Sequence, residues 1–337
     1  MIIGKQTDIR YFTGFEGDYG FLAVGNGPST FFTSSLYAEE ARQNLGDKLQ
    51  VTVPEKSLYD DMFALGKDFW GDRVGFNPGT VTCEHYTKMK ASFSACELIA
   101  EKDITETLRA VKTPDEIALI QKAQLIAETV LTSILPDLNE GVEEREIANE
   151  IDYRFRKEGG EKSSFETIVA FGANSSKPHA RPGITKLAHN DIVLFDMGTV
   201  VGGYASDMTR SYVFGKADSA TKAIYSAVLD AQEAAIDGIH DGILSKHADA
   251  LARDIITERG YGAEFVHTLG HGVGLDIHEF PALSKKSDTV LSKGMVVTVE
   301  PGIYIAGTGG IRIEDMLVIE TAGVKNLTSM PKKLTEL

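Results

Sequence analysis

The chain has 337 residues, 42% of them hydrophobic and 25% charged, which is typical of a folded protein with about two domains. Its formal net charge of −15 makes the surface repel phosphate backbones, so we expect no nucleic-acid partner. The first residues are too polar for a secretory signal, and no continuous apolar run approaches the roughly 20 residues that span a bilayer, so we expect a cytoplasmic protein without a membrane partner.

The first part of the chain consists of short apolar segments separated by glycines. Residues 8–53 are predicted to form strands and turns, with a helix over 36–45 that ends at Gly46. The cysteines, Cys83 and Cys96, lie in no CxxC or Cys/His cluster, and we expect both to be small buried hydrophobic residues. Together these segments predict an α/β domain.

A charged segment without a strong apolar face, residues 101–113, predicts a connector between two domains. We therefore expect an N-terminal domain over residues 1–108 and a C-terminal domain over residues 109–337. The second domain opens with a helix, because Thr113 is a capping residue, Pro114 suits the first turn and acids follow. Further helices are predicted over residues 143–158, 219–239 and 245–259.

The C-terminal domain also contains two predicted β-hairpins, each turning at clustered glycines: residues 191–198 with 204–214, and residues 295–305 with 311–320. Each hairpin carries two acids at mirrored positions: Asp196 and Asp207 in the first, Glu300 and Glu314 in the second. Folding at the glycines brings each pair close together, where like charges are destabilising. A single such acid could be a solvated residue or a salt-bridge partner. Two mirrored pairs on apolar strands favour a pair of divalent metal ions.

Histidines cluster where the sequence is rich in glycine. Three of the eight, His267, His271 and His278, lie in one segment whose glycines make a helix improbable, so we expect an extended or looped run that approaches a ligand closely. His179 lies in a polar loop after an apolar strand, a usual place for site residues. Imidazole with carboxylates suits manganese, cobalt, zinc or iron(II).

Together these residues resemble the metallopeptidase family that contains methionine aminopeptidase, Xaa-Pro aminopeptidase and prolidase, which has the pita-bread fold. The resemblance covers about residues 8–330, and the family's metal-ligand positions fall on Asp196, Asp207, His271, Glu300 and Glu314. It implies a pita-bread catalytic domain after a smaller creatinase-like α/β domain, and two divalent metals, with manganese preferred over cobalt, zinc or iron(II).

The resemblance also implies a role for each site residue. Asp207 and Glu314 would bridge the two metals, Asp196 would complete the shell of one, and His271 and Glu300 that of the other. Glu300 would also carry the proton. His179, His267 and His278 would orient the scissile carbonyl and the oxyanion, and Arg312 would hold a ligand carboxylate.

Two segments place the chain on the proline-peptidase branch by resemblance: residues 174–182 around His179, and residues 8–15, which are similar to a signature of the creatinase-like domain. The family usually carries some tens of residues before that signature, so we expect a shortened N-terminal domain. Ala282 stands where some prolidases have an arginine for the dipeptide carboxylate, which favours an Xaa-Pro aminopeptidase acting on short peptides with proline second. The alternative is an Xaa-Pro dipeptidase.

Two further alternatives remain beside the peptidase. A creatinase-like amidinohydrolase shares the fold but lacks the metal ligands, and non-catalytic relatives typically lose ligands and often carry charged tails. The intact ligand set argues against both. Relatives are often dimers, so a homodimer is expected.

Overall fold

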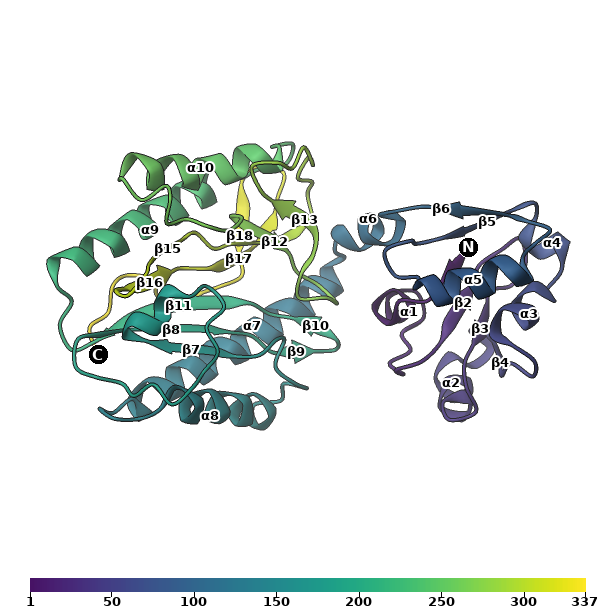
Figure 1. The fold of residues 1–337 in the computed structure, drawn as a ribbon, viewed down its shortest axis with the longest axis horizontal. Coiled ribbons are helices and arrows are strands. Elements are labelled where there is room, and N and C mark those ends of the chain that lie inside the picture. The colour runs from purple at the N-terminus through teal and green to yellow at the C-terminus, as the bar shows by residue number, and fades with distance from the viewer. The chain divides into compact units, whose positions relative to one another are not determined.

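The computed structural model describes residues 1–337, with the side chain of Asp47 left aside. The chain forms two compact units, Met1–Leu108 and Arg109–Leu337. Both combine sheets with covering helices (Figure 1).

The N-terminal unit is built on one six-stranded sheet with the strand order β4-β3-β2-β1-β5-β6. Strands β1, β2 and β3 pair antiparallel, whereas the remaining pairs are parallel. Its strands are β1 (Ile2–Ile3), β2 (Phe21–Ala23), β3 (Thr30–Phe32), β4 (Gln50–Thr52), β5 (Arg73–Phe76) and β6 (Glu97–Ala100). Its helices are α1 (Gln6–Thr13), α2 (Ala38–Leu45), the 3-10 helix η1 (Gly46–Lys48), α3 (Leu58–Phe63), α4 (Lys67–Trp70) and α5 (Cys83–Ser92), and α6 (Ile104–Ala110) follows at the division between the units.

Two sequence-based expectations in this region are wrong. Residues 8–13, predicted as strand and turn, belong to helix α1, which buries Ile9 and ends at Gly14 with a φ of 75°. In α1 the tertiary environment overrides weak local preferences. Cys83 is exposed rather than buried. The expected connector, residues 101–113, spans the division between the two units; it contains helix α6, whose last residue, Ala110, is fully buried.

The C-terminal unit has two helix pairs and two main sheets. Its helices are α7 (Pro114–Ile134), η2 (Leu135–Asp137), α8 (Glu144–Lys157), η3 (Gly172–Ser176), α9 (Ser219–Gly238) and α10 (Ser245–Glu258). A three-stranded sheet, β11-β8-β7, contains β7 (Ile168–Phe171), β8 (Asp191–Met197) and β11 (Met208–Phe214). A five-stranded sheet, β13-β12-β14-β17-β18, contains β12 (Gly270–Gly272), β13 (Glu279–Leu283), β14 (Val296–Val299), β17 (Asp315–Ile319) and β18 (Val324–Asn326). Two short ribbons pair β9 (Val200–Val201) with β10 (Tyr204–Ala205), and β15 (Gly302–Ile305) with β16 (Gly309–Arg312).

Each helix pair covers one sheet, so the unit has two similar halves. Helices α7 and α8 pack on the three-stranded sheet through residues such as Ile151 and Phe195, whereas α9 and α10 pack on the five-stranded sheet through residues such as Val228 and Leu317. Figure 1 shows the two helix pairs on opposite sides of the sheets. The two halves meet at the middle of the unit, where β11 contacts β16 and β17 and each half contributes one acid-bearing hairpin.

The helical segment Pro114–Asp137 is long and apolar enough to cross a membrane by length and composition, although the sequence has no continuous apolar run of that length. Half of its apolar window is buried inside the protein, where residues such as Ala127 and Leu131 belong to the core. This burial identifies it as the core helix of a folded domain. Its start has the predicted capping residue, Thr113, which forms a capping box with Glu116: each side chain accepts a hydrogen bond from the other's backbone N–H group.

Candidate metal centre and active site

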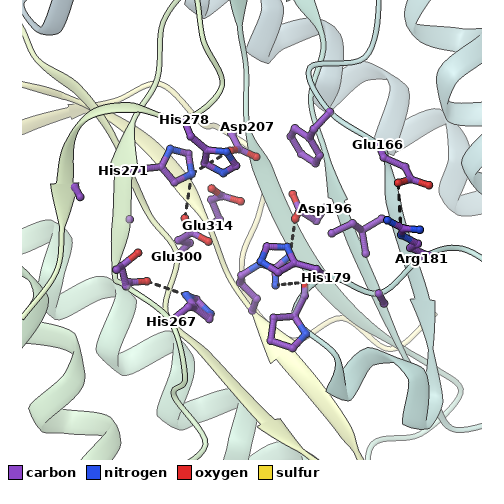
Figure 2. A pocket seen from close by; sticks show the side chains of 18 residues that line it. Glu166, His179, Arg181, Asp196, Asp207, His267, His271, His278, Glu300 and Glu314 are labelled. Carbon is purple, nitrogen blue, oxygen red and sulfur yellow. Dashed lines mark hydrogen bonds and ion pairs between the residues drawn. The ribbon is translucent and has the colours of Figure 1, made fainter. Parts of the chain in front are cut away.

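One cavity of about 430 Å³ in the C-terminal unit is lined by every site residue that the sequence singled out. These residues are His179, Asp196, Asp207, His267, His271, His278, Glu300, Arg312 and Glu314. Figure 2 shows the acids and imidazoles converging on this cavity from both hairpins and from the histidine-rich segment.

The strand registers bring the four acids together. In the first hairpin Asp196 lies opposite Thr209 in the β8–β11 pair, and Asp207 directly precedes β11. In the second, Val299 pairs with Asp315 and Gly302 pairs with Arg312. Glu300 and Glu314 therefore occupy directly opposed positions between these two strand pairs. The mirrored spacing in the sequence is thus reproduced in space, within two residues of register in the first hairpin.

The acids lie in an environment that disfavours their simultaneous ionisation. Burial and then the charges of Glu314, Asp196 and Glu300 raise the pKa of Asp207 well above its usual value. Burial and the charges of Glu300 and Asp196 do the same to the pKa of Glu314. Burial also raises the pKa of Asp196, against the opposing effect of Arg312. Three neighbouring carboxyl groups thus lack sufficient cationic compensation.

Glu300 differs from the other three acids because an imidazole faces it. Burial acts to raise its pKa, but the hydrogen bond and charge of His271 lower that pKa to about 2. Nε2 of His271 lies 3.3 Å from Oε1 of Glu300 and 3.6 Å from Oδ2 of Asp207. Its Nδ1 lies 3.1 Å from the carbonyl oxygen of Gly272. When Nδ1 carries the proton and donates it there, the lone pair of Nε2 points at the acids, as a metal ligand requires.

The donor set fits divalent metal ions. Ligand atoms of Asp207, His271 and Glu314 all lie within 4.8 Å of one another. Oδ1 of Asp196 and Oε1 of Glu314 are buried and have no hydrogen-bond partner among the residues that the structure describes. Unpaired buried carboxylate oxygens are costly, and cations would satisfy them. Carboxylates with one imidazole are a donor set that transition metals accept.

Arg312 and Tyr304 connect the two hairpins beside the acids. The Arg312 side chain is only 4% exposed; its Nη2 donates to Oδ2 of Asp196 at 2.6 Å and its Nε to Oγ1 of Thr209 at 2.9 Å. Its Nη1 donates to the Tyr304 hydroxyl at 2.7 Å, and that hydroxyl lies 2.9 Å from Nε2 of His267. Burial raises the pKa of Tyr304 to about 12, so the hydroxyl stays protonated. A continuous hydrogen-bonded chain therefore leads from Asp196 to His267.

Sequence reasoning missed Tyr304 and two threonines. The hydroxyl of Thr209 donates to Oε2 of Glu314 at 2.8 Å, and that of Thr298 donates to Oε1 of Glu300 at 3.1 Å. Each threonine lies two positions from an acid of its own hairpin, and alternate residues of a strand share a face. That period-two spacing was the signal available in the sequence.

The loop with His179 is held by a buried acid at the start of α8. Glu144 is fully buried, and its carboxylate accepts hydrogen bonds from the backbone N–H groups of Phe171 and Gly183 at 2.8 and 3.0 Å. The Asn174 side-chain amide donates to the same carboxylate at 2.8 Å. These bonds fix the loop that carries His179 into the cavity. Sequence reasoning did not single out Glu144, because its partners lie 27 to 39 positions away.

The histidine-rich segment is extended at its centre, as predicted, since His271 lies in β12. A Cβ atom at Gly270 would lie 2.0 Å from the carbonyl oxygen of Thr298, so this glycine allows close approach to the neighbouring strand. Gly270 also lines the cavity, and the expected close approach to a ligand stays a prediction. Further along, the rings of His271 and His278 lie 4.3 Å apart between centroids.

A buried ionic cluster anchors the end of this segment. Glu279, which follows His278, lies 2.5 Å from Nζ of Lys112 and 2.5 Å from Nη2 of Arg109. Arg109 also pairs with Asp276 at 2.8 Å. The residues that precede α7 thus fix the backbone on both sides of His278.

Comparison with known proteins agrees with this architecture. The chain matches metallopeptidase family M24 over residues 118–321 and the creatinase/prolidase N-terminal domain over residues 1–111. It is 42% identical over 335 residues to an Xaa-Pro dipeptidase from Pyrococcus horikoshii, covering 99% of this chain and 93% of that protein. The structure of an Xaa-Pro dipeptidase from Bacillus anthracis superposes with a TM-score of 0.96 at 37% identity, covering 100% of this chain and 94% of that one. The structure of an X-Pro aminopeptidase from Thermotoga maritima superposes with a TM-score of 0.90 at 31% identity, covering 100% of this chain and 97% of that one.

These matches confirm the predicted fold class, a pita-bread domain after a creatinase-like α/β domain. The resemblance that the acids and histidines suggested is confirmed as well. The chain belongs to metallopeptidase family M24 and carries the creatinase/prolidase N-terminal domain.

Proposed function

We propose that this metallo-exopeptidase is an Xaa-Pro dipeptidase, which hydrolyses the bond between an N-terminal residue and a C-terminal proline. The observation that carries the proposal is the convergence of four buried acids and His271 on one cavity, in a chain whose relatives include Xaa-Pro dipeptidases along nearly their full length. The cavity, at about 430 Å³, lies toward the small end of ligand sites, which suits a dipeptide.

The metal-binding residues in this proposal are Asp196, Asp207, His271, Glu300 and Glu314. When bound, divalent cations supply Lewis acidity and a water molecule of lowered pKa, the chemistry of metal-assisted peptide hydrolysis. Manganese is our first choice of ion because the donors are mainly carboxylate oxygens.

The remaining residues bind and orient the peptide. His179 lies on a loop fixed by Glu144, and His278 lies beside His271, so both can donate to the scissile carbonyl. Burial lowers the pKa of His267, which leaves it neutral near pH 7 and able to exchange a hydrogen bond with Tyr304. Glu300 is the proposed carrier of the proton from the attacking water to the proline nitrogen.

An Xaa-Pro aminopeptidase is the second candidate. It was the sequence-based preference, because Ala282 offers no cation to a dipeptide carboxylate. Ala282 does line the cavity, and the Thermotoga maritima protein is an X-Pro aminopeptidase. The comparisons nevertheless favour the dipeptidase, since the relatives with higher identity described above are dipeptidases.

The test is hydrolysis of Ala-Pro, Ala-Pro-Ala and Ala-Ala by purified protein with Mn²⁺, with a chelated sample and a Glu300→Gln variant as controls. Cleavage of Ala-Pro alone, lost in both controls, supports the dipeptidase. Cleavage of Ala-Pro-Ala would support the aminopeptidase instead. No cleavage of either proline peptide with Mn²⁺, Co²⁺ or Zn²⁺ would refute the proposal.

A further inference from the structure

Arg181 lines the same cavity but has no part in the chemistry described so far. It lies on the segment between η3 and β8, two residues after His179. Its side chain is 86% exposed, and its Nε lies 3.9 Å from Oε2 of Glu166, whose side chain is 72% exposed. A solvated ion pair at this distance is weak, so the guanidinium can exchange Glu166 for another anion.

The other arginine of the cavity is fully occupied. Arg312 is buried, and its nitrogens donate to Asp196, Tyr304, Thr209 and the carbonyl oxygen of Pro178. Among the described residues that line the cavity, Arg181 is therefore the arginine or lysine that can receive a new anion.

The positions of these residues separate two regions of the cavity. In Figure 2, Arg181 and Glu166 lie at one side, and His271, Glu300 and Glu314 lie at the other, with His179 and Asp196 between them. A dipeptide with its scissile bond near the acids and His179 can extend its proline toward Arg181.

The substrate brings an anion that needs such a partner. The α-carboxyl group of a peptide has a pKa of roughly 3.5, so a dipeptide carries a carboxylate at neutral pH. Entering the cavity removes part of that carboxylate's hydration, which is costly unless a cation or hydrogen-bond donors face it. A guanidinium matches a carboxylate with two parallel hydrogen bonds, whereas the Ala282 side chain offers only a methyl group.

We propose that Arg181 binds the free carboxylate of the dipeptide and thereby selects dipeptides over longer peptides, an inference that rests on the proposed function. Glu166 competes with the substrate carboxylate for the same guanidinium. Position 282 lacks a cation, and Arg181, on another segment of the cavity lining, supplies it.

The experiment compares Ala-Pro with Ala-Pro amide, in which the carboxylate is replaced by a neutral carboxamide. Steady-state kinetics with Mn²⁺ are measured for wild type, Arg181→Met, Arg181→Lys and Glu166→Gln. The matched control is Lys186→Met, which removes an exposed positive charge from the same segment outside the cavity lining.

In Arg181→Met, KM for Ala-Pro should rise about 10- to 100-fold, as expected for the loss of a hydrogen bond to a charged group, while kcat changes less than about threefold. Its kcat/KM for Ala-Pro amide should remain at the wild-type value. Arg181→Lys should recover part of the loss, because it restores the charge but not the paired geometry. Glu166→Gln should lower KM for Ala-Pro by up to about fivefold, the range of a surface ion pair.

A wild-type enzyme that hydrolyses neither proline substrate overturns the proposed function, and the role of Arg181 with it. If the wild type is active but Arg181→Met keeps the wild-type KM for Ala-Pro, the role of Arg181 alone is overturned. The same holds if its kcat/KM falls equally for Ala-Pro and Ala-Pro amide. If Lys186→Met raises KM for Ala-Pro as much as Arg181→Met does, the effect comes from the loss of any nearby positive charge, which would contradict the proposal.

Discussion

Nη2 of Arg312 lies 2.6 Å from Oδ2 of Asp196, although the two residues are 116 positions apart in the chain. An arginine of the second hairpin thus forms an ion pair with an acid of the first, and this contact links the two halves of the domain at the cavity. The positive charge of Arg312 also offsets one of the buried carboxylates.

Arg312→Ala should destabilise the protein by about 3 kcal/mol or more, because it leaves the buried Asp196 without its cationic partner. The free energy of unfolding from urea denaturation checks this. The matched control is Arg259→Ala, which breaks a half-exposed ion pair with Asp230 and should cost less than about 1 kcal/mol. Equal effects of the two substitutions would contradict the importance given to the Arg312–Asp196 contact.

Tyr304→Phe should lower kcat and reduce the free energy of unfolding by about 1–3 kcal/mol. The substitution removes the hydroxyl that Nη1 of Arg312 and Nε2 of His267 share as a hydrogen-bond partner. Metal content should stay at the wild-type level, because the hydroxyl contacts none of the proposed ligands directly. Tyr153→Phe, on the exposed face of α8, provides the control and should change neither quantity. A Tyr304→Phe enzyme with wild-type kcat would show that the series of hydrogen bonds from Asp196 to His267 has no role in turnover.

The acids of both hairpins were predictable from the sequence because strand pairing around a glycine turn is local. Mirrored spacing about Gly202 and Gly307 was enough to predict that each pair would meet. Tyr304 and Glu144 were not predictable in this way. Their roles arise from contacts with a strand or loop whose position depends on the packing of the whole domain.

The N-terminal unit was harder to predict for a related reason. Tyr11, Phe12 and Thr13 favour strands, yet they lie in the short helix α1, where Ile9 is fully buried. Burial against the sheet decides this segment, and the sequence pattern does not reveal where that sheet lies.

His179→Ala should reduce kcat for Ala-Pro by about 100-fold or more, as expected when a donor to the developing oxyanion is removed. Metal content should remain near wild type, because His179 is assigned to the substrate. His247→Ala, exposed on α10, serves as the control. Loss of bound metal from the His179→Ala protein would make this histidine a ligand and refute the assignment.

Removal of metal should make stability depend on pH in a defined direction. In the folded chain, burial and the charges of neighbouring acids raise the pKa values of Asp207 and Glu314, so these two groups bind more protons there than in the unfolded chain above about pH 4. This contribution to the free energy of unfolding is present at low pH and is lost as pH rises through the folded-state pKa values. The Tm of the chelated protein should therefore fall as pH rises toward 8, and at pH 8 it should lie below that of the metal-loaded protein.

Asp207→Asn tests the repulsion between the acids directly, because it removes one of the repelling charges. At pH 8 it should raise the Tm of the chelated protein and lower that of the metal-loaded protein. A chelated Asp207→Asn protein that is less stable than chelated wild type would show that the acids do not repel one another as described.

The number of Mn²⁺ ions bound per chain, measured by equilibrium dialysis and elemental analysis, tests whether the two hairpins build a two-metal site. We expect two ions for wild type and fewer than one for Glu314→Gln, since Glu314 is a proposed bridging ligand. A wild-type chain that binds no Mn²⁺ or only one ion, or a Glu314→Gln chain that retains both, would contradict this expectation.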